Sequence, residues 1–375
     1  MIYEHKKIKK ALLLYQKNIT MNKFINRIVS NKITLIGEIG VNYYDIAKKE
    51  NISPLDAALK MIDEGKAAGL NAVKFQTYKA ETLASKNSPS YWDLNEESST
   101  SQYELFKKFD SFGEEEYKIL SMHCEKIGIE FLSTAFDFNS ANYLDKLMNV
   151  YKISSSDLTN LPFIAHQAKK NKPILLSTGA ANLEEIEKAV KTIRNKNDKP
   201  LVLLHCVLEY PTPKNHANLA KITSLKKHFP DVYIGYSDHT KPDDNFDVLK
   251  AAYILGARVI EKHYTLDKTL KGNDHYHAMD PTDIRKIINE ISGLQNILGS
   301  DELRYSDTEN DARKYARRSI VSKCDIAKGE TITADKLCFK RPGTGISPAQ
   351  YKSIIDKIAG IDIAEDTILQ VDMFL

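Results

Sequence analysis

The sequence predicts a (β/α)8 TIM barrel followed by a small β-rich module. Eight short apolar segments alternate with eight helix-period segments over about 270 residues, the arrangement and length of such a barrel. The apolar segments are rich in Ile, Val and Leu without polar alternation, as expected of parallel strands buried on both faces. A doubly wound sheet is the alternative, but no Gly-x-Gly-x-x-Gly follows the first strand.

The strands and helices are expected in strict alternation. The expected strands are Ile33–Gly37, Ala72–Gln76, Glu130–Thr134, Val150–Ser154, Pro173–Ser177, Leu201–Cys206, Val232–Ser237 and Arg258–His263. The expected helices are 54–69, 114–127, 139–148, 161–170, 183–194, 217–228, 246–255 and 282–297. Ser53, Asn182 and Asp280 each stand just before an expected helix and are good N-caps.

The second βα unit contains a long insertion, residues 79–113. Its polar stretch Ser85–Gln102 includes Tyr91 and Trp92. Loops that follow strands lie at the carboxyl-terminal face of a barrel, so this insertion is either a lid over the site or a surface loop.

The composition changes after Leu298, which predicts a second domain. Residues 299–313 are polar and are interpreted as a linker, and residues 314–375 contain short β-like pieces with Gly and Pro turns. The resulting division is a basic extension 1–32, a barrel 33–298, the linker 299–313 and a small domain 314–375. A module of about 60 residues is marginal alone, so we expect it to dock on another surface.

Charge and composition exclude several classes of protein. The chain of 375 residues has a net charge of +3, but residues 1–30 alone carry +6, which leaves the body slightly acidic and unlike a nucleic-acid-binding surface. No apolar run is long enough for a membrane span. The basic extension is interpreted as a solvated helix or frayed tail, with a membrane-binding or partner-binding helix as the alternative. The four cysteines have no metal or disulfide spacing, so reduced thiols of a cytoplasmic protein are expected.

Polar residues follow every expected strand, at the end where a barrel carries its catalytic groups. Lys74 and Lys152 lie inside apolar strands, where a charge needs an anionic partner or a shifted pKa. Two lysines and several hydroxyls around one barrel mouth suit a phosphate or carboxylate ligand.

Histidines at the ends of neighbouring strands suggest a metal site. His239 and His263 end the seventh and eighth strands, so their imidazoles can hold one divalent cation and leave positions for water and substrate. His205 is a further candidate ligand one strand away. His275 and His277 lie in the loop after the eighth strand and either complete the metal site or belong to a polar loop.

At these residues the sequence resembles the N-acetylneuraminate (sialic acid) synthase family, over residues 33–375. The matching segments are Ile36–Asn42, Val73–Thr77, Phe131–Thr134, Tyr151–Ser155, Leu176–Gly179, His205–Cys206 with Tyr210–Pro213, Gly235–Thr240, Glu261–His263 and Gly272–Asp274. Residues 314–375, with Lys340–Gly343, resemble the family's C-terminal antifreeze-like (SAF) module.

The resemblance implies a metal-dependent condensation of phosphoenolpyruvate with N-acetylmannosamine or a related sugar, which releases phosphate and gives a sialic (nonulosonic) acid. It implies that His239 and His263 bind the cation, Mn²⁺ or Mg²⁺. The implied phosphoenolpyruvate-binding residues are Lys74, Thr134, Lys152, Ser155, Ser177 and Ser237. Those implied near the sugar and the reacting carbons are Glu38, Gln76, Asp157, Tyr210 and Asp274. Arg341 matches an arginine that enters the neighbouring subunit's barrel, which implies a domain-swapped homodimer.

Three departures and two rival functions stand beside this expectation. Residues 43–52 are longer than the family's usual turn after the first strand, and the loop Gly272–Asp280, with Tyr276 and His277, has no clear match in the family. Leu208 replaces an Asn that is common in the family, on the phosphate side of the site. The enzymatic rival is a Schiff-base pyruvate aldolase of the sialic acid lyase type, with Lys152 as nucleophile. The non-enzymatic rival is an ice-binding or structural protein, which the basic side chains of the tail argue against.

Overall fold

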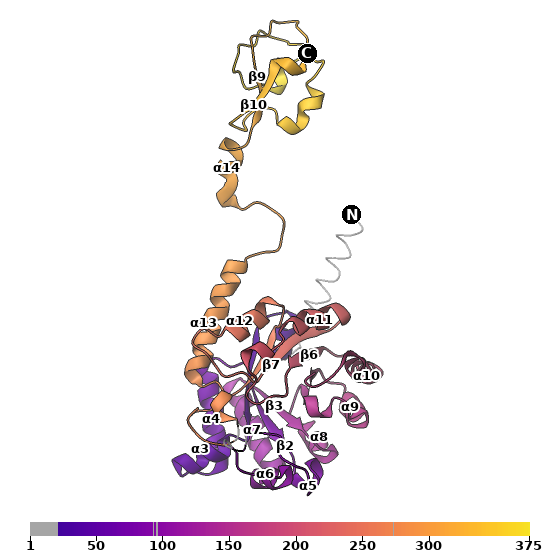
Figure 1. Cartoon of the computed structure of the whole chain (residues 1–375), viewed down its shortest axis with the longest axis vertical. Helices are drawn as coiled ribbons and strands as arrows, with labels where there is room; N and C mark the ends of the chain where they lie inside the picture. The colour runs from indigo at the N-terminus through magenta and orange to yellow at the C-terminus, as the bar shows by residue number, and fades with distance from the viewer. Residues whose placement is uncertain (1–21, 93, 95–96, 273) are drawn as a thin grey trace. The chain divides into compact units, whose positions relative to one another are not determined.

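The computed structural model describes residues 22–92, 94, 97–272 and 274–375. Its internal contacts divide the chain into two compact units, Met1–Leu298 and Gly299–Leu375 (Figure 1).

The first unit is a closed barrel of parallel strands in sequential order, which confirms the predicted fold. Its strands are β1 (Thr34–Gly40), β2 (Ala72–Thr77), β3 (Glu130–Ala135), β4 (Tyr151–Ile153), β5 (Ile174–Ser177), β6 (Leu201–Cys206), β7 (Tyr233–Asp238) and β8 (Val259–His263). β1 pairs with both β2 and β8, which closes the barrel. The strand β1 runs beyond its expected end at Gly37, and its pairing with β2 becomes irregular between Glu38 and Gly40, which has a φ of 55°.

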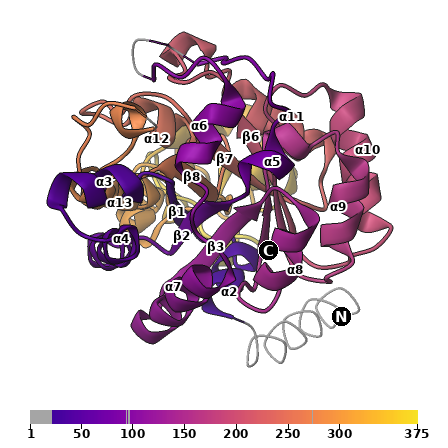
Figure 2. The same cartoon turned by 90° about the horizontal axis from the view of Figure 1, so that it is seen from below.

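Helices surround the strands (Figure 2). They are α2 (Lys23–Val29), α3 (Tyr43–Glu50), α4 (Pro54–Ala68), α5 (Ala80–Leu83), α6 (Gln102–Lys108), α7 (Glu114–Ile127), α8 (Phe138–Leu144), α9 (Leu161–Ala168), α10 (Leu183–Arg194), α11 (Ala220–His228), α12 (Asp247–Ile254) and α13 (Pro281–Leu298). The hydroxyl of Ser53 and the amide oxygen of Asn182 accept backbone N–H bonds at the starts of α4 and α10, as their positions predicted. Among the described residues, no helix is long and apolar enough to cross a membrane.

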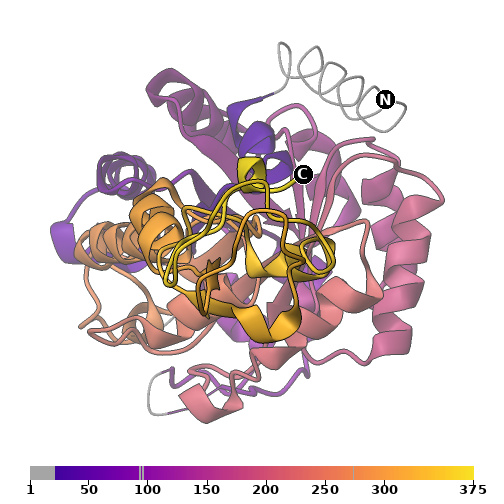
Figure 3. The same ribbon diagram turned by 90° about the horizontal axis from the view of Figure 1, so that it is seen from above.

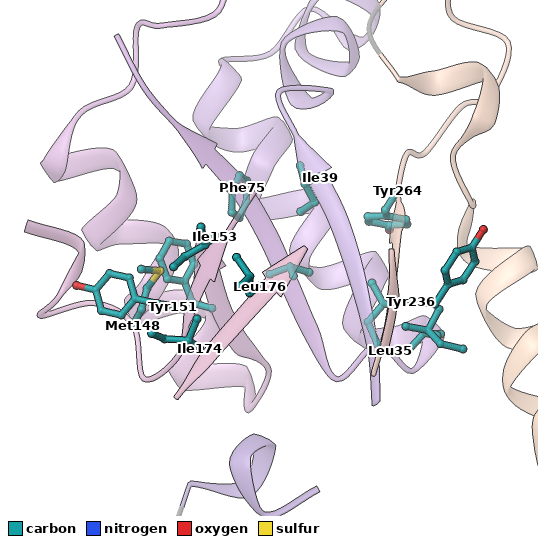
Figure 4. Close-up of a cluster of buried hydrophobic side chains, with 14 of the residues drawn as sticks. Leu35, Ile39, Phe75, Met148, Tyr151, Ile153, Ile174, Leu176, Tyr236 and Tyr264 are labelled. Carbon is teal, nitrogen blue, oxygen red and sulfur yellow. The ribbon is translucent and has the colours of Figure 1, made fainter. Parts of the chain in front are cut away.

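Strand residues alternate between the two sides of the barrel wall. The outward-facing side chains pack against the helices and form the larger core. Figure 4 shows part of this core, in which β1 contributes Leu35 and Ile39, β2 contributes Phe75, and β5 contributes Ile174 and Leu176.

The inward-facing side chains form an apolar layer near the amino-terminal ends of the strands. This layer consists of Ile36, Ala72, Leu132, Val150, Leu175, Val202, Leu204 and Val259. Helix α2 belongs to the same cluster through its buried Phe24, Ile25 and Ile28. It therefore closes the end of the barrel opposite to the carboxyl ends of the strands, and the expectation of a solvated or frayed segment is wrong for Lys23–Val29. Residues 1–21 of the expected extension lie outside the described residues.

The second unit has a small core of its own. It contains α14 (Asn310–Tyr315) and the antiparallel strands β9 (Ser319–Ser322) and β10 (Leu337–Lys340), with loops and 3-10 turns around them (Figure 3). The 3-10 turns are Asp307–Glu309, Ala334–Lys336, Pro348–Ser353 and Val371–Met373. Buried residues such as Ile320, Ile332 and Leu369 form the core, so the β-rich character expected for this part of the chain is confirmed.

The helix that closes the barrel should contribute strongly to stability. We predict that Phe24→Ala lowers the free energy of unfolding by about 3–5 kcal/mol, because Phe24 is 3% exposed inside the apolar layer. Ile297→Ala is the control, since Ile297 in α13 is 81% exposed. Urea denaturation followed by circular dichroism measures both. Equal denaturation midpoints for the two variants would show that α2 does not stabilise the barrel.

Candidate functional site

A pocket of about 280 Å³ opens at the carboxyl ends of the strands, where a TIM barrel carries its active site. The structure brings together there most of the residues singled out from the sequence. They are Glu38, Lys74, Gln76, Thr134, Lys152, Ser155, Ser177, Tyr210, Ser237, His239 and His263. Most of them come together because they occupy the inward-facing positions that follow the apolar layer on their strands.

The floor of this pocket is a chain of four buried charges. Lys74 Nζ lies 2.6 Å from a Glu38 oxygen and 3.9 Å from Glu261, and Lys152 Nζ lies 3.5 Å from Glu261. All four side chains are at most 6% exposed. The anionic partners that the buried lysines require are therefore two carboxylates from β1 and β8.

Burial and the neighbouring charges act in opposite directions on these groups. Burial works to lower the pKa of Lys74, but Glu261 and Glu38 raise it above its ordinary value, so Lys74 is a firm cation. Burial lowers the pKa of Lys152, with Glu261 opposing. Burial raises the pKa of Glu38 against the pull of Lys74. For Glu261, the two lysines outweigh burial and hold the pKa below its usual range.

Hydroxyl and amide groups extend the charged floor. Lys74 donates to the Thr134 hydroxyl at 3.2 Å, Gln76 donates to Glu38 at 3.0 Å, and Ser237 donates to Glu261 at 3.0 Å. The Ser177 hydroxyl is buried and has no hydrogen-bond partner within the described residues. A donor left without a partner beside two lysines is suited to an anionic oxygen of a ligand.

The two imidazoles predicted as metal ligands lie close together at the ends of the neighbouring strands β7 and β8, with ring centroids 5.4 Å apart. His239 Nδ1 lies 2.7 Å from the Val207 carbonyl and donates to it, which leaves Nε2 as the unprotonated nitrogen. Burial lowers the pKa of His239 to about 4 and that of His263 well below its ordinary value, with the neighbouring imidazoles adding to the effect at His263. Neutral imidazoles with a directed lone pair fit a divalent cation.

The loop after β8 supplies a carboxylate beside these histidines. An Asp274 oxygen lies 3.3 Å from His263 Nδ1, and the other oxygen lies 3.6 Å from His277 Nε2. Burial and the nearby Glu38 carboxylate raise the pKa of Asp274 to about 7, whereas Lys74 acts to lower it. Asp274 and Tyr210 also line an adjoining pocket of about 160 Å³.

That adjoining pocket has an aromatic wall from the insertion after β2. Tyr91, Trp92, Phe106 and Phe109 line it, and Tyr91, Gln102 and Phe106 also line the larger pocket. The insertion therefore borders the site, which is the position that a lid over the site requires.

Two barrel candidates lie outside the pocket lining, and a third belongs to the other unit. Asp157 bonds to Asn160 and Ser154 in the 3-10 turn Ser155–Asp157 and does not line the described pocket. Arg341 belongs to the second unit, where its side chain is exposed. His205 is not a metal-ligand candidate, because it faces away from the pocket, stacks on Tyr236 and bonds to the Ala217 carbonyl.

One site residue, Glu261, has no role assigned from the sequence, and for His277 the sequence leaves two alternatives open. Glu261 stands two positions before His263 on β8, so strand alternation places both on the inner face, and this signal would have identified it. His277 lies in a loop, where no periodicity predicts which way a side chain points.

Comparisons with known proteins identify the families that the two parts of the chain match. The NeuB family model matches residues 61–303, and the SAF domain model matches residues 317–375. The chain is 40% identical to the uncharacterized protein MJ1065 of Methanocaldococcus jannaschii, over 86% of this chain and 90% of that protein. It is 37% identical to the N,N'-diacetyllegionaminic acid synthase of Campylobacter jejuni, over 90% of this chain and 99% of that protein. The crystal structure of the N-acetylneuraminic acid synthetase of Leptospira borgpetersenii, 33% identical, superposes with a TM-score of 0.65 over 75% of this chain and 90% of that one.

Proposed function

Because the chain belongs to the NeuB family, we propose that it condenses phosphoenolpyruvate with an N-acetylated amino sugar and releases phosphate. Relatives of the chain are named N,N'-diacetyllegionaminic acid synthase, N-acetylneuraminate-9-phosphate synthase and pseudaminic acid synthase. The observation that carries the proposal is the buried floor of Lys74, Glu38, Glu261 and Lys152 beneath two neutral imidazoles. It combines anion-binding and cation-binding groups in one pocket.

The lysine side of the pocket binds phosphoenolpyruvate in this proposal. Lys74 and Lys152 donate charge-assisted hydrogen bonds to its phosphate and carboxylate. The hydroxyls that complete this half are those of Thr134, Ser155, Ser177 and Ser237. The open-chain sugar lies toward Gln76, Tyr210 and Asp274, beside the aromatic wall.

His239 and His263 would hold the divalent cation, Mn²⁺ or Mg²⁺. When bound there, the cation supplies Lewis-acid polarisation of the sugar's aldehyde carbonyl. A carbon–carbon bond then forms between the methylene carbon of phosphoenolpyruvate and the aldehyde carbon, whose oxygen takes a proton. Positive charge develops at the neighbouring enol carbon. Glu38 stabilises this charge and accepts a proton from the water that attacks the enol carbon, before the carbon–oxygen bond to phosphate breaks.

A panel of sugars tests the proposal directly. We expect phosphate release from phosphoenolpyruvate with at least one of N-acetylmannosamine, its 6-phosphate and 2,4-diacetamido hexoses. The activity should disappear with a chelator and in His239→Ala, because the cation is required. Phosphate release that survives thorough chelation would contradict the metal-dependent mechanism.

The same assay distinguishes the rival aldolase. Burial lowers the pKa of Lys152, a property that also suits a Schiff-base nucleophile. An aldolase would use pyruvate, resist the chelator and be trapped at Lys152 by borohydride. We expect no trapping, because Lys152 lies 3.5 Å from the Glu261 carboxylate, which stabilises its ammonium form.

The two lysines should act mainly on phosphoenolpyruvate. We predict that Lys74→Ala and Lys152→Ala each raise its KM roughly ten- to a hundredfold, since each removes a charge-assisted contact of about 1.5–3 kcal/mol. Lys271→Ala is the control. Steady-state kinetics at saturating sugar measure the effect, and an unchanged KM in both variants would reject the assignment of the anion-binding half.

The exposed Arg341 tests the proposed domain-swapped homodimer. If Arg341 completes the partner's sugar site, mixing Arg341→Ala chains with His263→Ala chains should restore activity, because one site of the heterodimer then has an intact barrel and an intact tail. We expect up to half of the sites in such a heterodimer to be active, measured as phosphate release after subunit exchange.

A pair of barrel variants provides the matched control for this experiment. Lys74→Ala mixed with His263→Ala should give no rescue, since every barrel keeps a defect. If verified exchange of Arg341→Ala with His263→Ala chains also gives no rescue, the domain swap is rejected and the barrel chemistry is unaffected.

A further inference from the structure

We propose that His277 is a third imidazole ligand of the cation site, together with His263 and His239, and that Asp274 completes the set. The loop after β8, and not only the ends of β7 and β8, would then build the site. The inference rests on the cation of the proposed function and adds to it a ligand and a metal preference.

His277 is a buried polar side chain without a hydrogen-bond partner among the residues that the structure describes. It is fully buried, and neither of its ring nitrogens has a hydrogen bond within the described residues. His275, two positions earlier, is equally buried, but its Nδ1 bonds to the Thr265 hydroxyl at 2.7 Å and its Nε2 to Asp45 at 3.2 Å. An unsatisfied buried polar group costs about 1–3 kcal/mol. His275 is therefore explained by the fold alone, whereas His277 is not.

The surroundings of His277 are those of a ligand set. Its ring centroid lies 4.9 Å from that of His263 and 6.2 Å from that of His239. Ligand atoms of His263, Asp274 and His277 all lie within 4.8 Å of one another, with Asp274 oxygens at 3.3 and 3.6 Å from the two imidazoles. Ligands about 2.1 Å from one octahedral ion lie roughly 3 Å apart when adjacent, so His263, Asp274 and His277 are close to the spacing that one ion requires.

The chemical form of these rings suits metal binding. His277 adds a third imidazole ring to those of His239 and His263. Lone pairs of neutral imidazoles compete poorly for Mg²⁺, which prefers oxygen ligands and water, and well for first-row transition metals. Three imidazoles and one carboxylate thus predict a site that favours Mn²⁺ or a later transition metal over Mg²⁺.

Direct binding of Mn²⁺ in the absence of substrates tests the inference. His277→Phe keeps the ring volume against Tyr210 and Tyr276 but has no ligand atom. We expect at least tenfold weaker Mn²⁺ binding by electron paramagnetic resonance titration, with Mg²⁺ competition changed much less. His216→Ala is the control, because His216 is exposed and paired with Glu209.

The outcomes separate this inference from the proposed function. If Mn²⁺ binding is weak in His239→Ala but unchanged in a folded His277→Phe protein, the role of His277 is overturned and the proposed function is not affected. Absence of any saturable Mn²⁺ binding by the wild-type chain overturns both. Pulsed electron paramagnetic resonance of Mn²⁺ bound to the wild-type protein counts the coupled imidazole nitrogens and needs no variant. Three coupled imidazole nitrogens support the inference, and two reject it.

Discussion

The buried pair of Lys74 and Glu38, joined at 2.6 Å, is the interaction on which the site depends. Removing one partner of such a pair leaves an uncompensated charge and costs about 3–5 kcal/mol, so neither residue can be considered alone. Glu261 links this pair to Lys152, which makes one network from β1, β2, β4 and β8. The charges neutralise one another only when these strands are in the observed register. The network therefore constrains the pairing of the barrel as well as the chemistry of its pocket.

The interior of the barrel separates stability from function along the strand direction. Apolar side chains fill the half closed by Phe24, Ile25 and Ile28 of α2, and polar side chains begin one inward-facing position later. On β2, for example, Ala72 belongs to the apolar layer and Lys74 to the charged floor. A second ion pair, Lys262 with Asp238 at 2.6 Å, lies on the outward side of neighbouring strands and fixes the backbone that carries His239 and His263. This arrangement holds the imidazoles on rigid elements rather than on loops alone.

Periodicity explains how much of this could be predicted from the sequence. All the strands and most helices of the barrel were located within a few residues, because burial on both faces leaves an unmistakable apolar run. For the same reason the sequence predicts one pocket for Lys74 and Lys152, which lie on strands, and for His239, which directly follows β7. The expectation for helix α2 is wrong because the sequence of a seven-residue helix with basic neighbours resembles that of a solvated segment. Only the fold shows the apolar end of the barrel against which this helix packs. His277 and Asp157 lie in short 3-10 turns between the strands and helices, and the geometry of such turns depends on contacts with residues distant in sequence.

The charge balance of the pocket links its two halves. Lys74 and Lys152 already face Glu38 and Glu261, so the floor itself offers no excess positive charge to a phosphate and a carboxylate. Bringing such an anion into a buried pocket therefore requires further compensation. The imidazoles are neutral and cannot supply it by themselves, since burial holds the pKa of His239 at about 4. A divalent cation among them would add two positive charges beside the ligand. Electrostatics thus makes the binding of anion and cation mutually favourable, which gives a physical reason for placing neutral histidines directly above a floor of balanced ion pairs.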